Sequence, residues 1–227
     1  APTVAAEMRH IVQSIISAAV DEQYIYMDVS RGLIDPAHTP KEKRALKSDE
    51  ITRLMAADIE PVNYAYAMLM LGCGLRRGEA LTLTWDDIHD GYVHVNKTIL
   101  ITGGAGVAKL HPKSDAGIRD IPLPVAVEKA LAVLPHTYKN ILHDDGRLTA
   151  WHIDKLWSDV AEAADLPDDV TPHTLRHTYA TKLFYGGVDI KTAQKLLGHN
   201  HIKTTLDIYV HCQDIDKDTI ELIKKLF

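Results

Sequence analysis

Two arginines, two histidines and a tyrosine lie in otherwise apolar segments, at spacings that suit chemistry on a phosphodiester. The C-terminal part of the chain holds His173-Thr-Leu-Arg176, then Leu-Leu-Gly-His199, then Tyr209, and Gly-Leu-Arg76 lies far upstream. Arginine can donate two parallel hydrogen bonds to phosphate oxygens, and a nearby histidine can exchange a proton. The set therefore predicts a site that holds a phosphodiester and attacks it without a metal.

The reactivity of Tyr209 and two further residues bear on this prediction. The phenol of Tyr209 has an ordinary pKa near 10, so its attack requires a base or a strongly positive surrounding. Lys113 lies in the turn 111–117 between two expected strands, and it can protonate a leaving alkoxide if that turn reaches over the phosphate. Glu79, three residues after Arg76, is close enough to orient its guanidinium.

Each motif also has an ordinary structural interpretation. His173 can cap a helix that begins at Thr171-Pro172, Arg76 and Glu79 can form a surface pair, and Tyr209 can belong to the core. His173 and His177 are four residues apart, which is also the spacing of a metal-binding pair, but no acidic base follows in the His-Glu-x-x-His manner. We expect neither a metal nor a cofactor.

The elements that must position these residues are mostly helices. Apolar periodicity predicts a helix over residues 8–33, and further helices over 49–58, 62–72 and 77–83. Short β-like runs separated by glycine-rich turns follow at 92–95, 97–101 and 119–123. From residue 124 onward the pattern is helical again, in five or six segments. The fold class is therefore mainly α with a small antiparallel β-sheet.

Composition restricts the class of protein but leaves its substrate open. The 227 residues, 46% of them hydrophobic, suffice for one large domain, or one domain and part of another. No apolar stretch can span a bilayer, no secretory signal is recognisable, and two isolated cysteines favour a reduced, cytoplasmic protein. A net charge of −6 favours a small substrate over nucleic acid. Basic residues can nevertheless converge on one face: Arg76, Arg77, Lys109, Lys113, Arg119 and Arg176.

Taken together and in this order, the motifs resemble the catalytic domain of the tyrosine recombinases, the phage integrase family. The resemblance runs from about residue 46 to the C-terminus and implies the tyrosine recombinase catalytic fold. It also implies that the two arginines hold the scissile phosphate while the tyrosine attacks and becomes a 3′-phosphotyrosine. Every expected role has a residue: Arg76 and Arg176 (phosphate), Tyr209 (nucleophile), Lys113 (general acid), His173 (base), His199 (hydrogen-bond donor) and Glu79 (orienting acid).

The resemblance also implies an organisation. Residues 1–36 look like the last helix of a mostly missing core-binding domain, residues 37–47 like a linker, and residues 48–227 like the catalytic domain. An amphipathic tail helix over 214–227 either packs on its own domain or docks into a neighbouring subunit. The implied partners are double-stranded DNA at specific sites, a homo-tetramer on that DNA, and accessory DNA-bending or directionality factors, with no membrane.

The sequence also leaves rival functions open. The motif sequences are most similar to those of integrases of prophages and conjugative transposons, which act in the bacterial cytoplasm. A type IB topoisomerase has the same chemistry and relaxes supercoils. Two further rivals are a non-catalytic DNA-binding remnant and a metal-dependent hydrolase that uses some of the 13 histidines.

Overall fold

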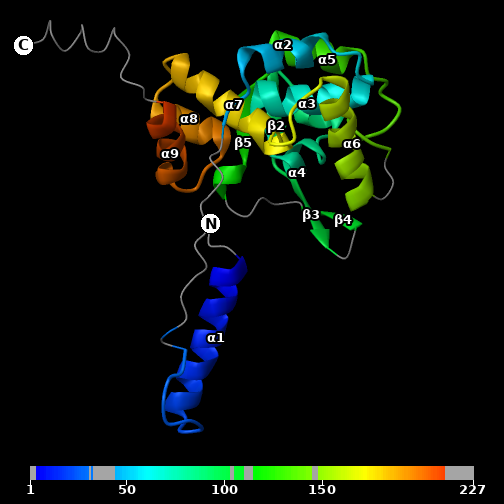
Figure 1. Ribbon diagram of the computed structural model, residues 1–227. Helices are drawn as coiled ribbons and strands as arrows, with labels where there is room; N and C mark the ends of the chain where they lie inside the picture. Colours follow the sequence, from blue (N-terminus) through cyan, green and yellow to red (C-terminus); the bar gives the residue numbers. More distant parts are fainter. Residues whose placement is uncertain are drawn as a thin grey trace, which may run out of the picture. The chain divides into compact units, whose positions relative to one another are not determined.

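The computed structural model describes residues 4–30, 32, 44–102, 105–109, 115–144 and 148–212. The chain divides into a unit of residues 1–42 and a unit of residues 43–227 (Figure 1). Lys113, most of the predicted linker and the predicted tail helix 214–227 lie outside the described residues. None of the described helices is both long and apolar enough to cross a membrane.

The described residues of the first unit contain helix α1 (Val4–Asp21), which ends 12 residues before the end of the helix predicted over residues 8–33. The prediction was wrong because the backbone reverses after Asp21: Gln23 has a left-handed φ of 61°, and the N–H of Tyr24 returns to the carbonyl of Ala19 at 2.8 Å. Apolar side chains of α1 are exposed within this unit: Met8, Ile11, Val12 and Ile15.

The second unit is built around α3 (Pro61–Cys73), most of whose residues are buried. It packs against α5 (Val125–Ala132), α6 (Ala150–Ala163) and α7 (Pro172–Tyr185), which lie around it in Figure 1. Helices α8 (Ile190–Leu197) and α9 (Ile202–Cys212) pack against α7 and against each other. The five helices from residue 125 to residue 212 agree with the predicted helical segments.

Two short helices precede the strands. Helix α2 (Ser48–Ala56) lies close to its predicted range. The helix expected over 77–83 is a single turn, α4 (Arg77–Ala80), because the N–H groups of Thr82 and Leu83 bond three residues back instead of four. A 3-10 turn over Trp85–Asp87 leads into the strands, and a second covers Asp115–Gly117.

The strands form two antiparallel groups, where the sequence predicted one small sheet. Strands β1 (Ile88–His89), β2 (Tyr92–Val95) and β5 (Arg119–Pro122) form one sheet in the order β1-β2-β5. Strands β3 (Thr98–Thr102) and β4 (Ala105–Lys109) form a separate hairpin. The sequence did not predict β1, which has two residues, or β4, whose alanines and glycine are poor strand formers. The fold class, mainly α with a small antiparallel sheet, is confirmed.

Candidate active site

The loop between α3 and α4 places Arg76. Helix α3 ends at Gly74, which adopts a left-handed φ of 63°. A Cβ on Gly74 would lie 2.2 Å from the ring of Tyr179, so only glycine allows α7 to pack this close to the loop. Arg76 then precedes α4, and both its backbone N–H and its Nη1 donate to the carboxylate of Glu79, at 2.8 and 2.7 Å. The predicted pairing of Arg76 with Glu79 is confirmed.

Glu79 is a buried carboxylate surrounded by three arginines. Besides Arg76, it accepts two hydrogen bonds from Arg119, and Nη1 of Arg176 lies 3.9 Å from its Oε2. Burial alone would raise the pKa of Glu79, but the hydrogen bond and charge of Arg119, with the charges of Arg76 and Arg176, lower it to about 2. Glu79 is therefore ionised at neutral pH and holds the arginine side chains together.

The C-terminal end of α8 provides one carbonyl to each of these arginines. The carbonyl of Leu196 accepts from Nε of Arg119 at 2.7 Å. The next carbonyl, of Leu197, accepts from Nη2 of Arg176. The third carbonyl, of Gly198, accepts from Nη2 of Arg76 at 2.7 Å. Helix ends leave carbonyls without intrahelical partners and carry partial negative charge, so α8 orients all three guanidinium groups with its last turn.

Arg176 lies on the first turns of α7, which begins at Thr171 and Pro172 as predicted. Its side chain is buried, and its Nη1 donates to the carbonyl of Gly74 at 2.6 Å. Burial, together with the charge of Arg76, lowers its pKa to about 9, although Glu79 acts in the opposite direction. The guanidinium therefore remains positively charged at neutral pH, in a surrounding that strengthens its interaction with an anion.

His199 follows the left-handed cap at Gly198, which has a φ of 61° as the sequence predicted. Its Nδ1 lies 2.9 Å from the hydroxyl of Thr205, a completely buried residue of α9. Burial, followed by the charges of Arg176, Arg76, Arg119 and His173, lowers the pKa of His199 to about 3. The imidazole is therefore neutral at physiological pH.

The remaining predicted residues are described to different extents. His173 is exposed on the first turn of α7, and it is one of the groups whose charge acts on His199. Tyr209 belongs to α9, four residues after Thr205, but its side chain lies outside the described part. Lys113 lies outside the described residues entirely. Where the structure describes the chain, no cluster of three or more His, Cys, Asp or Glu side chains has a geometry suited to a metal ion.

Arg119 was not among the residues singled out as catalytic, although it was one of several basic residues expected on one face. The structure brings Arg76, Arg119 and Arg176 together, whereas Arg77 pairs with Asp154 of α6 at 3.4 Å. Three guanidinium charges against one carboxylate leave this region positive, in a chain whose net charge is −6. Such a region favours a bound anion, and a phosphodiester fits the donors present.

Comparison with known sequences agrees with this geometry. The model of the Phage integrase family matches residues 44–215. The chain is 32% identical to tyrosine recombinase XerD of Caulobacter vibrioides over 223 residues, covering 92% of the chain and 71% of that protein. It is also 32% identical to XerC of Brucella melitensis biotype 1 over 195 residues, covering 77% of the chain and 60% of that protein. The chain thus spans about 60% of the length of this XerC relative.

Solved structures share the fold. The Tn1549 transposon integrase in complex with a circular intermediate DNA superposes with a TM-score of 0.71 at 22% identity, over 96% of this chain and 77% of that one. A lambda integrase dimer bound to a COC′ core site superposes with a TM-score of 0.64 at 19% identity, over 92% of this chain and 60% of that one. The family model covers most of the chain, and the XerD relative is 32% identical to it. The chain therefore belongs to the phage integrase family.

Proposed function

We propose that the protein is a site-specific DNA recombinase that cuts and rejoins DNA through a covalent 3′-phosphotyrosine, for integration or excision of a mobile element. The observation that carries the proposal is the convergence of Arg76, Arg119 and Arg176 on Glu79 and on the end of α8, next to the helix of Tyr209. The relatives that the chain resembles are named as recombinases and integrases.

The proposed reaction begins with the phosphate held by Arg76 and Arg176. The hydrogen bonds described above occupy two of the five N–H groups of each guanidinium. In the proposed complex, further N–H groups of these two side chains would bind the non-bridging oxygens and stabilise the charge that develops in the transition state. Arg76, with 41% of its side chain exposed, is the more accessible of the two.

In the proposed first step, the phenol oxygen of Tyr209 attacks the phosphorus and the bond to the 5′-oxygen breaks. Lys113 protonates that leaving oxygen, and His173 accepts the proton of the phenol. Attack by the 5′-hydroxyl of another strand reverses the step and joins new partners. The phosphoester bond is conserved in the covalent link, so no nucleotide is consumed and no metal ion is required.

His199 would act as a neutral hydrogen-bond donor in this scheme. If the hydroxyl of Thr205 donates to Nδ1, the proton of the ring lies on Nε2 and can be donated to a phosphate oxygen. A pKa of about 3 makes a proton-carrying role for this imidazole at neutral pH unfavourable. Glu79 orients Arg76 and remains ionised.

The proposed assembly follows the organisation expected from the sequence. Residues 1–36 would end an upstream DNA-binding domain, whose remaining part would cover the exposed apolar side chains of α1. The partners would be double-stranded DNA at specific sites and three further copies of the protein, with the tail 214–227 either packed on its own domain or docked into a neighbouring subunit. Accessory bending or directionality factors would assist, and the protein would act in the bacterial cytoplasm.

The test is covalent trapping on a nicked suicide DNA of the element's ends. We expect the wild-type chain to form a protein–DNA adduct in excess EDTA, and Tyr209→Phe to bind the same DNA without forming the adduct. Loss of the adduct on chelation would favour the metal-dependent hydrolase, and a full adduct yield from Tyr209→Phe would remove Tyr209 from the mechanism. Relaxation of supercoils without strand exchange would identify a type IB topoisomerase.

A further inference from the structure

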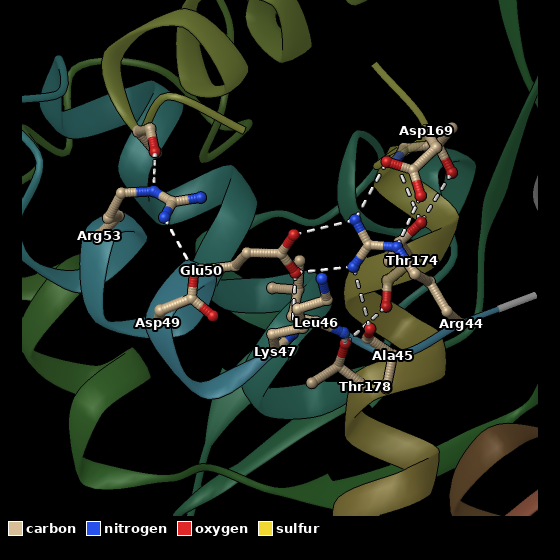
Figure 2. A network of polar contacts seen from close by, with 12 residues as sticks. Arg44, Ala45, Leu46, Lys47, Asp49, Glu50, Arg53, Asp169, Thr174 and Thr178 are labelled. Atoms are coloured by element: carbon tan, nitrogen blue, oxygen red, sulfur yellow. Dashed lines mark hydrogen bonds and ion pairs between the residues drawn. The ribbon is translucent and has the colours of Figure 1, made fainter. Parts of the chain in front are cut away.

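One polar cluster outside the active site connects the beginning of the second unit to helix α7. Arg44 lies between two carboxylates, Glu50 of α2 and Asp169 of the loop before α7 (Figure 2). Its Nη1 and Nη2 donate to the two oxygens of Glu50 at 2.7 and 2.9 Å. Its Nε and Nη2 donate to the two oxygens of Asp169 at 2.6 and 3.0 Å. We call these three residues the Arg44 cluster.

The geometry of this cluster differs from that of an ordinary surface ion pair. Single exposed pairs contribute little, whereas paired parallel hydrogen bonds from arginine within a network are stronger and more directional. Glu50 is buried, and its Oε2 also accepts from the backbone N–H of Lys47 at 2.8 Å. Arg44 itself is 28% exposed. The fork of one guanidinium therefore fixes the loop before α7 against the first turn of α2.

A second contact joins the same two segments. The backbone N–H of Leu46 donates to the hydroxyl of Thr178 at 2.8 Å, and that hydroxyl donates to the carbonyl of Thr174 one turn earlier in α7. Both threonines are buried. The segment that enters the second unit is thus bound to α7 at Asp169, three residues before the helix begins, and again at its second turn.

Helix α7 carries the active-site arginine on its opposite side. At about 100° per residue, Arg176 lies roughly 200° around the helix from Thr174 and also from Thr178. On that side Arg176 donates to the carbonyls of Gly74 and Leu197. One face of α7 therefore contacts the entry segment, and the other contacts the active site.

From this arrangement we infer that Arg44 is a positioning residue for the DNA-cleavage step: it fixes the start of α7, and with it His173 and Arg176. The inference depends on the proposed function, because cleavage is the step that Arg44 would influence.

The experiment compares Arg44→Gln with Arg53→Gln in the 227-residue chain. Arg53 is the matched control, because it pairs with the exposed Asp49 at 2.9 Å on α2, away from Asp169 (Figure 2). The rate of adduct formation is measured at saturating suicide DNA, and the Kd is measured in a Tyr209→Phe background. We expect Arg44→Gln to lower the rate about tenfold with a Kd within twofold, and Arg53→Gln to change neither beyond twofold.

Asp169→Asn is the alternative variant if Arg44→Gln does not fold. It changes only the contact with the loop before α7 and leaves the pair of Arg44 and Glu50 intact. We expect the same loss of rate, and no further loss in the double variant Arg44→Gln/Asp169→Asn. An unchanged rate in Asp169→Asn, or a change confined to the Kd, would overturn the inference.

A wild-type chain that forms no adduct would refute the proposed function instead. The positioning of α7 is then tested by amide hydrogen exchange. Asp169→Asn should accelerate exchange in the first two turns of α7 and leave α3 unchanged, and unaltered exchange in α7 would refute the positioning role as well.

Discussion

Arg119 and Glu79 form a fork-to-fork pair in which both side chains are almost completely buried. Nη2 of Arg119 lies 2.8 Å from Oε2 of Glu79, Nη1 lies 3.2 Å from Oε1, and the side chains are 1% and 2% exposed. Two further N–H groups of Arg119 donate to the carbonyls of Leu196 and Gly117. Strand β5, helix α4 and the end of α8 therefore meet at this pair. It lies behind Arg76, whose side chain is partly exposed to solvent.

The first prediction concerns the removal of one partner of this pair. Arg119→Met should lower the free energy of unfolding by about 3–5 kcal/mol, because Glu79 would stay buried with much of its charge uncompensated. The double variant Arg119→Met/Glu79→Gln should lose less than the sum of the single changes. Urea denaturation followed by circular dichroism measures both. A loss below about 1 kcal/mol in Arg119→Met would contradict this account of the pair.

The sequence predicted Arg76 with Glu79 but not Arg119 with Glu79, and the reason is separation along the chain. Glu79 is three residues from Arg76, a spacing that local helix geometry brings into contact. Arg119 is 40 residues away, and only the packing of β5 against α8 brings it near. One local signal existed: Arg119 alternates with Asp120 in a strand whose Ile121 is buried, so Arg119 and Ile121 share the buried face.

Other parts of the fold also separate into features set by local sequence and features set by the packing of distant segments. The left-handed caps at Gly74 and Gly198 and the start of α7 at Thr171-Pro172 depend on local chemistry, and helix boundaries near them were predictable. The carbonyls of Leu196, Leu197 and Gly198 each select a different arginine only after α7, β5 and the α3–α4 loop have packed together. No sequence pattern encodes that convergence.

The second prediction concerns Gly198, which the end of α8 requires for two separate reasons. It has a positive φ, and a Cβ would lie 2.8 Å from Nη1 of Arg119 and 3.0 Å from the carbonyl of Ala116. Gly187 also has a positive φ, of 74°, but a Cβ there would have no neighbour within 4 Å. Gly187→Ala therefore measures the cost of the backbone conformation alone, about 1 kcal/mol.

We expect Gly198→Ala to lose clearly more stability than Gly187→Ala in urea denaturation, and to slow adduct formation because it displaces the guanidinium of Arg119. Equal losses in the two variants would mean that the close approach of Arg119 to Gly198 has no energetic consequence.

The third prediction concerns the dependence of stability on pH. His199 has a pKa of about 3 in the folded protein, whereas an unfolded histidine titrates near 6.5. Between these values the unfolded chain binds the proton and the folded protein does not, so acid favours unfolding. The contribution of His199 is therefore complete above pH 6.5 and is lost progressively as the pH falls towards 3, by at most about 1.4 kcal/mol per pH unit.

Urea denaturation between pH 4.5 and 7.5 measures this slope. His199→Gln should reduce it, whereas His201→Gln should leave it unchanged, because His201 is an exposed imidazole two residues further on. A wild-type slope that His199→Gln does not alter would show that this imidazole is not the group responsible.

The last prediction concerns Thr205, which connects the helix of Tyr209 to the active site. Its hydroxyl lies 2.9 Å from Nδ1 of His199, and the residue is fully buried, so Thr205→Val keeps the shape while leaving one ring nitrogen without that partner. An unsatisfied buried polar group costs about 1–3 kcal/mol, and the imidazole also loses the bond that selects its tautomer. We therefore expect Thr205→Val to lower stability and slow adduct formation, Thr205→Ser to retain both, and the exposed Thr204→Val to change neither. Thr205→Ser keeps the hydroxyl and removes only the methyl group, whereas Thr205→Val keeps a methyl group and removes the hydroxyl. Retention in serine with a loss in valine therefore assigns the loss to the hydrogen bond, and unchanged stability and rate in Thr205→Val would show that this hydrogen bond has no energetic consequence.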